Sequence, residues 1–105
     1  MENKKDFFEV WKEESPETLQ AFFDFAGAIG KHGGLDEKTF QLVYIGMQTC
    51  KGNAASVAGH TVFAKQAGAT REEIKGVIFT SMMEVGINGV YDCLLAALEA
   101  YDNAQ

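Results

Sequence analysis

The side chains with the clearest chemical potential lie around a histidine in a run of small and polar residues. Asn53, Ser56 and His60 follow one another at steps of three and four, which brings side chains to one face of a helix. An imidazole titrates near neutral pH, so His60 suits the role of a proton shuttle in a pocket between helices. The alternative, which the same pattern allows, is a core histidine held by hydrogen bonds.

Three polar residues are candidates for lining a substrate site beside His60. Gln41, in the preceding helical stretch, has an amide that could orient His60 or a ligand. Asn53 is one of the best residues for capping a helix, and Ser56 follows in the first turn, so both also have structural explanations. We expect Gln41, Asn53 and Ser56 to bind substrate if His60 is catalytic.

The two cysteines supply a second possible chemistry. Cys50 and Cys93 lie far apart in the sequence and form neither a CxxC motif nor a metal-knuckle spacing, so in a reducing compartment they are expected to be free thiols. Cys50 is near the end of a helix, where the helix dipole disfavours a thiolate, and Cys93 follows the acidic Asp92. Buried, unreactive thiols are the default interpretation. The alternative is a redox site in which Cys93 or Cys50 works with His60.

Helices must position all of these side chains. Apolar residues recur at helical spacing in six stretches, over residues 4–12, 16–29, 36–51, 53–67, 70–86 and 88–101, and glycines mark every boundary after the first. Expected starts are Ser15 before Pro16, Asp36, and the capping box formed by Thr70 and Glu73. No stretch resembles paired strands, so the sequence predicts an all-α protein.

Length, charge and composition restrict the class of protein. The 105 residues are 47% apolar and predict a single domain over 1–105. The net charge is −6 and the nine basic residues are scattered, which argues against nucleic acid as a partner. We expect no membrane contact and a cytoplasmic location, because no apolar run approaches a bilayer span and no signal-peptide core follows Met1. Neither a metal site nor a cofactor is expected.

The segment KTFQLVYIGMQTCKGNAASVAGHTVFAKQAGATREEI resembles the carboxymuconolactone decarboxylase and alkyl hydroperoxidase D-like family, and AKQAGATREEI is the strongest single match. The likeness extends over about two-thirds of the chain, from Leu35 to Ala100. It implies a six-helix orthogonal bundle, assembly as a trimer or hexamer, and a small-molecule substrate. The eight Phe, one Trp and three Tyr residues would suit a subunit interface.

The resemblance also shows what this chain lacks. Family peroxidases carry a Glu, a CxxC motif and a His four residues after the second Cys. When His60 is matched to that His, Gln41 stands at the Glu position, and Asn53 and Ser56 stand at the first and second Cys positions. The family's decarboxylases commonly have a Glu where Ser56 stands. Three functions remain open. We place first an antioxidant, peroxidase-type oxidoreductase with an unconventional thiol site around His60. The alternatives are a cofactor-free lyase or isomerase with His60 as general acid or base, and a non-catalytic oligomeric binding protein.

Overall fold

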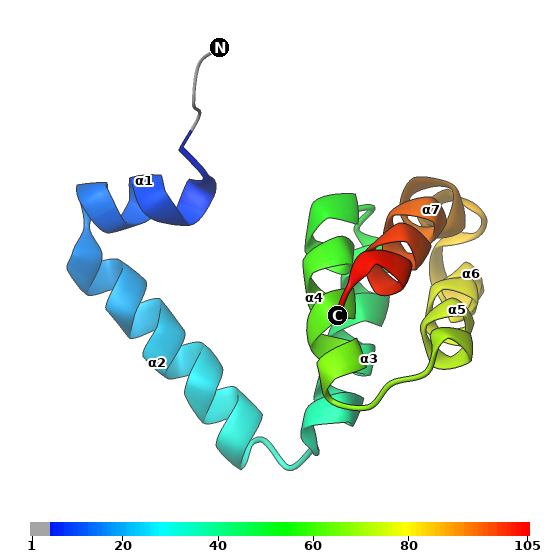
Figure 1. The fold of residues 1–105 in the computed structure, drawn as a ribbon, viewed down its shortest axis with the longest axis horizontal. Helices are drawn as coiled ribbons and strands as arrows, with labels where there is room; N and C mark the ends of the chain where they lie inside the picture. The colour runs from blue at the N-terminus through cyan, green and yellow to red at the C-terminus, as the bar shows by residue number, and fades with distance from the viewer. Residues whose placement is uncertain (1–4) are drawn as a thin grey trace. The chain divides into compact units, whose positions relative to one another are not determined.

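The computed structural model describes residues 5–105, and all of the regular structure in that range is helical (Figure 1). The helices are α1 (Phe7–Glu14), α2 (Pro16–His32), α3 (Glu37–Cys50), α4 (Ala54–Gln66), α5 (Arg71–Thr80), α6 (Met82–Val85) and α7 (Asn88–Asn103). The predicted all-α class is therefore confirmed. The predicted start of the first helix, at Lys4, lies outside the described residues. None of the helices in residues 5–105 has the length and apolar character needed to span a bilayer.

The chain forms two compact units, one ending at Leu35 and the other running from Asp36 to Gln105. In the first unit, aromatic rings join α1 to α2: Phe8 packs on Phe23 and Trp11 on Phe22, with ring centroids 5.6 and 5.3 Å apart. Leu19 is the one buried side chain of these two helices. The prediction of a single domain over 1–105 stays a prediction.

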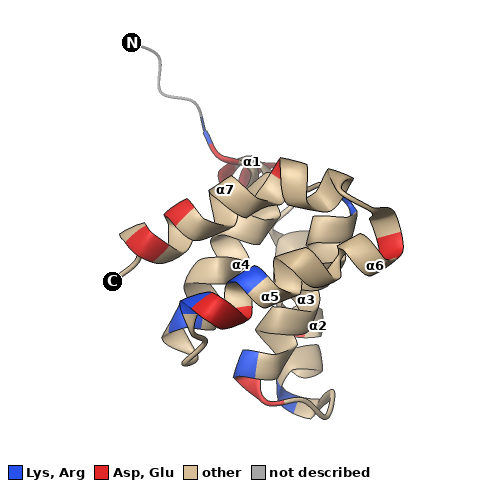
Figure 2. Ribbon diagram, turned by 90° about the vertical axis from the view of Figure 1, so that its right-hand side faces the viewer, with Lys and Arg blue, Asp and Glu red and all other residues tan. Residues whose placement is uncertain are grey.

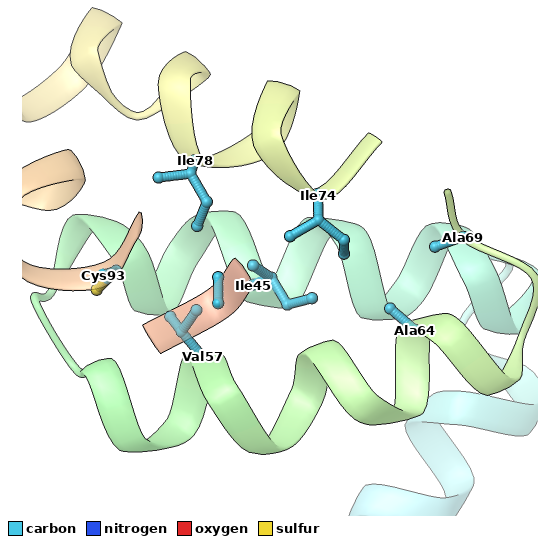
Figure 3. Packing of buried hydrophobic residues seen from close by; sticks show 8 residues of the cluster. Ile45, Val57, Ala64, Ala69, Ile74, Ile78 and Cys93 are labelled. Carbon is cyan, nitrogen blue, oxygen red and sulfur yellow. The ribbon is translucent and has the colours of Figure 1, made fainter. Parts of the chain in front are cut away.

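The second unit contains the main apolar core. There α4 packs chiefly against α3 and α7, and α5 contacts both of those helices. Figure 3 shows the core cluster inside this unit, with Ile45, Ile74 and Ile78 pointing toward one another. The cluster consists of Ile45, Val57, Ala64, Ala69, Ile74, Ile78, Cys93 and Ala97. Burying such apolar side chains supplies most of the driving force for folding. Because the buried side chains are closely packed, they hold α3 and α4 at a fixed register.

Side-chain caps begin three helices of the second unit where the sequence predicts them. Asp36 accepts the backbone N–H of Thr39 at 2.8 Å, which starts α3. Asn53 accepts that of Ser56 at 3.1 Å, which starts α4. Thr70 and Glu73 form the capping box of α5, each accepting the other's backbone N–H. These caps satisfy amide groups that have no partner within the helix.

Ser15 differs from its prediction as a side-chain cap. Pro16 is the first residue of α2 as expected, but the Ser15 side chain makes no capping hydrogen bond. Ser15 also ends α1, because its N–H donates to the carbonyl of Trp11 at 2.8 Å. Its own carbonyl accepts from the Thr18 hydroxyl at 3.1 Å. The backbone of Ser15 thus bonds to α1 through its N–H and to α2 through its carbonyl, and its side chain does not cap the first turn of α2.

The helix predicted over 70–86 is interrupted at Ser81, so α5 and α6 are separate. The buried Ser81 hydroxyl donates to the carbonyl of Ile78 at 2.6 Å, and the Ser81 N–H donates to the same oxygen at 3.2 Å. A serine that bonds a carbonyl of the preceding turn competes with regular helix bonding and bends the chain. Apolar periodicity runs through this break, which explains why the sequence pattern did not reveal it.

Charged side chains are interspersed over the second unit. Figure 2 shows basic and acidic positions on several helices, without a continuous basic run along any helix drawn there. Lys38 of α3 pairs with Glu73 of α5 at 3.0 Å, and Arg71 pairs with Asp102 of α7 at 2.9 Å. Exposed pairs of this kind contribute little individually. The absence of a nucleic-acid partner stays a prediction.

Candidate functional site

His60 and Gln41 meet where α4 lies against α3. His60 Nδ1 and Gln41 Oε1 are 2.8 Å apart, a hydrogen-bond distance between residues nineteen apart in the sequence. His60 is half-buried, and Gln41 is buried with 5% of its surface exposed. Both residues were sequence candidates, and the predicted ability of Gln41 to orient His60 is what this contact provides.

A carboxylate occupies the other end of the Gln41 amide. Gln41 Nε2 donates to Glu37 Oε2 at 2.8 Å, one turn earlier in α3. An ionised carboxylate only accepts hydrogen bonds, so the NH₂ group must face Glu37 and the carbonyl must face His60. Gln41 Oε1 in turn only accepts, which makes His60 Nδ1 the donor. The neutral imidazole therefore carries its proton on Nδ1 and its lone pair on Nε2.

Two aromatic rings flank the imidazole of His60. Tyr44 lies edge-on with a centroid separation of 4.4 Å and an interplanar angle of 63°. Phe63, one turn after His60 in α4, is edge-on at 5.6 Å and 78°. Burial lowers the pKa of His60 below its ordinary value, and the Glu37 carboxylate opposes this shift only in part. His60 is therefore neutral near pH 7.

Asn53 and Ser56 meet each other at the start of α4. The Asn53 side chain is used as a cap, as its structural explanation predicts. Ser56 is half-buried and lies one turn before His60 in the same helix, as the spacing indicates. Their role in substrate binding stays a prediction.

Cys93 is a member of the apolar core. It is fully buried in α7 and packs in the cluster that contains Val57 of α4 and Ile45 of α3 (Figure 3). Burial, followed by the charge of Asp92, raises the pKa of the Cys93 thiol. A nucleophilic cysteine needs a lowered pKa and access to substrate. Both properties of Cys93 fit the default interpretation of a small apolar side chain.

Cys50, in contrast, borders an open groove of about 690 Å³ formed by α3, α5 and α6. Val43 and Met47 line this groove from α3, and Glu73 and Glu84 contribute carboxylates. In a helix, positions 43, 47 and 50 share one face, whereas positions 41 and 44 lie on another. The groove that holds Cys50 and the site of His60 thus use different faces of α3.

Sequence reasoning missed Glu37, Tyr44 and Phe63. Glu37 and Gln41 are four residues apart, a spacing at which helical side chains interact, so that pair had a signal in the sequence. The contact of Tyr44 with His60 had none, because it depends on how α3 and α4 are rotated against each other.

Comparison with curated proteins and with solved structures gives no match. A family comparison does: residues 16–99, from the start of α2 to the last turns of α7, match the model of the carboxymuconolactone decarboxylase family. The matched range contains Glu37, Gln41 and His60. The chain belongs to the carboxymuconolactone decarboxylase family.

Proposed function

We propose that this protein is a cofactor-free lyase or isomerase in which His60 is the general base. The observation that carries the proposal is the hydrogen bond between His60 Nδ1 and Gln41 Oε1, because it leaves the Nε2 lone pair available to a substrate. A general base must also be unprotonated at the working pH. Burial lowers the pKa of His60, which meets that requirement at neutral pH.

The substrate class follows from the chemistry of a neutral imidazole between aromatic rings. We propose a small compound with a C–H bond next to a carbonyl group. Nε2 takes that proton, the C–H electron pair moves into an enolate, and the imidazolium returns a proton to the same carbon or to a conjugated one. The family's name refers to the decarboxylation of a carboxylated lactone. In a decarboxylation Nε2 takes the proton of the carboxylic acid, the bond to CO₂ breaks and leaves the same enolate, and the imidazolium returns that proton to the carbon.

The test is solvent deuterium incorporation, which detects proton transfer whether the net reaction is isomerisation or decarboxylation. The native protein is incubated in D₂O with a panel of unsaturated lactones and β-keto acids, and exchange is followed by proton NMR. We expect exchange into at least one member, with a rate that falls about 10²- to 10⁴-fold in His60→Gln, the usual contribution of a general base. The matched control is His32→Gln, which alters the exposed histidine at the end of α2 and should leave the rate unchanged. Equal rates in wild type and His60→Gln would contradict the proposal.

The antioxidant, peroxidase-type interpretation takes second place in this proposal. One observation favours it: Cys50 is partly exposed and borders the groove of α3, α5 and α6. Against it, Cys93 is buried with a raised pKa, and Cys50 lies on a face of α3 away from His60. We expect Cys50 to react first with a disulfide reagent and Cys93 to react only on unfolding. Rapid oxidation of either thiol by an organic hydroperoxide, slowed by His60→Gln, would restore the peroxidase to first place.

We also propose that the protein is a homo-oligomer. The helices α1 and α2 bury only Leu19, while Phe7 and Phe25 are 69% and 66% exposed. Apolar rings of this size are normally covered in a stable protein, and a second copy would provide such cover. Light scattering is expected to give a multiple of 11.5 kDa. A monomer mass would exclude the oligomer.

A further inference from the structure

We propose that Glu37 is a positioning residue: acting through the Gln41 amide, it fixes the tautomer of His60 so that Nε2 is the basic nitrogen. The inference deepens the proposed function and rests on it for its catalytic consequence. The tautomer itself is a property of the folded protein and is measurable without a substrate. Glu37 does not touch His60; its contact is with Gln41.

The first step concerns the two ends of the amide. Rotating a glutamine amide by half a turn exchanges its carbonyl and NH₂ groups with little change in shape, so packing alone does not choose between the orientations. Here one end meets the carboxylate of Glu37 at 2.8 Å and the other end meets His60 Nδ1 at 2.8 Å. His60 is adaptable, because Nδ1 donates in one tautomer and accepts in the other. Glu37 is not adaptable, and it decides the orientation.

The second step concerns burial. Gln41 is 5% exposed, whereas Glu37 is exposed. A hydrogen bond to a surface carboxylate competes with water and is weak on its own account. Burial strengthens the preference, because in the reversed orientation the Gln41 carbonyl would face the Glu37 carboxylate, and two acceptors in a poorly hydrated place repel each other. The NH₂ group of Gln41 therefore favours the orientation in which Glu37 accepts its proton.

The third step is the consequence for the imidazole. If the amide turned over, its NH₂ group would face Nδ1, which would then have to accept and could not carry the proton. The proton would move to Nε2, and the lone pair needed for catalysis would point at Gln41 instead of a substrate. Loss of the orienting carboxylate thus removes the base without removing the histidine.

The experiment is a nitrogen–proton correlation NMR spectrum of the imidazole rings at about pH 8, where His60 is neutral because burial lowers its pKa. His60 is assigned by its absence in His60→Gln, and exposed His32 is an internal reference. We expect wild-type His60 to carry its proton on Nδ1. In Glu37→Ala the Nδ1–H population should fall, and in Glu37→Lys it should fall at least as far, because an ammonium group only donates and attracts the amide carbonyl.

The matched control is Glu72→Ala, which removes another exposed carboxylate from the first turn of a helix, in this case α5. Like Glu37→Ala, it removes a favourable interaction between a carboxylate and the N-terminus of a helix. Because Glu72 does not contact Gln41, the His60 tautomer should stay unchanged. A wild-type His60 protonated on Nε2 would overturn the proposal, and so would an unchanged tautomer in both Glu37 variants. If the assay for proton transfer succeeds, Glu37→Ala should also lower its rate about tenfold, the equivalent of one hydrogen bond. Failure of the activity assay alone would count against the proposed function and not against this tautomer.

Discussion

At the level of single residues, the site is defined by a neutral amide where family peroxidases carry a carboxylate. Gln41 orients the imidazole of His60 through a bond of 2.8 Å but contributes no charge. A carboxylate in that place would stabilise the imidazolium form and favour the acid. The amide leaves burial as the main influence on the histidine, and burial favours the base.

Replacing the Gln41 amide by a carboxylate tests this argument directly. Gln41→Glu places an acceptor next to Nδ1 that has nearly the same shape, and we expect the pKa of His60 to rise above its wild-type value. Proton NMR titration of the ring measures it. Gln41→Glu also places two carboxylates, at positions 37 and 41, one helical turn apart, where they repel each other. A second variant that combines Gln41→Glu with Glu37→Gln removes this repulsion and keeps the carboxylate beside His60. A His60 pKa that stays the same in both variants would contradict the electrostatic account.

The sequence suggested that Gln41 could orient either His60 or a ligand, but it did not describe the environment of these residues. Helical spacing placed His60 on a polar face, and the amide of Gln41 was a reasonable orienting group. The rings of Tyr44 and Phe63 reach His60 because of the rotation of α3 against α4 and of side-chain rotamers, neither of which periodicity encodes. The burial of Cys93 was predicted as a default, because free cysteine is commonly a small core residue.

At the level of helices, close packing occurs at Gly89 of α7 and not at Gly59 of α4. Gly59 lies among small residues that would allow a close helix approach, yet a Cβ at Gly59 would have nothing within 4 Å. The close approach is at Gly89 in the first turn of α7. A Cβ there would lie 2.8 Å from the Ser81 hydroxyl and 2.9 Å from the carbonyl oxygen of Thr49.

This packing predicts opposite effects for two alanine substitutions. Gly89→Ala should lower the free energy of unfolding by about 1–3 kcal/mol, because the backbone oxygen of Thr49 cannot move aside without disturbing α3. Gly59→Ala should raise it by about 0.5–1 kcal/mol, since alanine is the better helix former and space is open. Urea unfolding of both variants measures the difference. Equal effects would contradict the close approach of α7 at Gly89.

Helix starts were the most predictable part of the fold, because caps are local. Asp36, Asn53 and Thr70 each bond an amide within three residues, so the information lies in a few letters of sequence. The interruption at Ser81 was not predictable in this way. A serine on a continuous apolar pattern is compatible with an unbroken helix, and only the buried position of its hydroxyl directs it to Ile78.

At the level of the whole molecule, two sets of groups make stability depend on pH in separate ranges. Burial lowers the pKa of His60 in the folded state, so below about pH 6.5 the unfolded chain binds a proton that the folded protein does not. Stability therefore falls as the pH drops through this range. The pKa values of Asp36, Glu73 and Asp102 are lowered by hydrogen bonds to Thr39, Thr70 and Arg71, and their contribution is lost only at more acidic pH.

His60→Gln should separate the two ranges. The variant lacks the titrating imidazole, so its stability should stay flat as the pH falls from about 6.5 to 5, and it should then fall with the carboxylates as the wild type does. Urea midpoints measured across that range give the comparison. His32→Gln, at the exposed histidine, should follow the wild-type curve. A His60→Gln curve parallel to the wild type would show that His60 has an ordinary pKa in the folded protein.

The most direct test of a base at His60 is the pH dependence of deuterium exchange into an active carbonyl compound, compared with the pKa of His60 from NMR titration. The account predicts a rate that rises with pH through a single ionisation at the depressed pKa of His60 and then stays level. The rate should persist after both thiols have been alkylated in a protein that remains folded. A rate that instead rises in the alkaline range of a thiol and disappears on alkylation would contradict the account and return the site to Cys50 or Cys93.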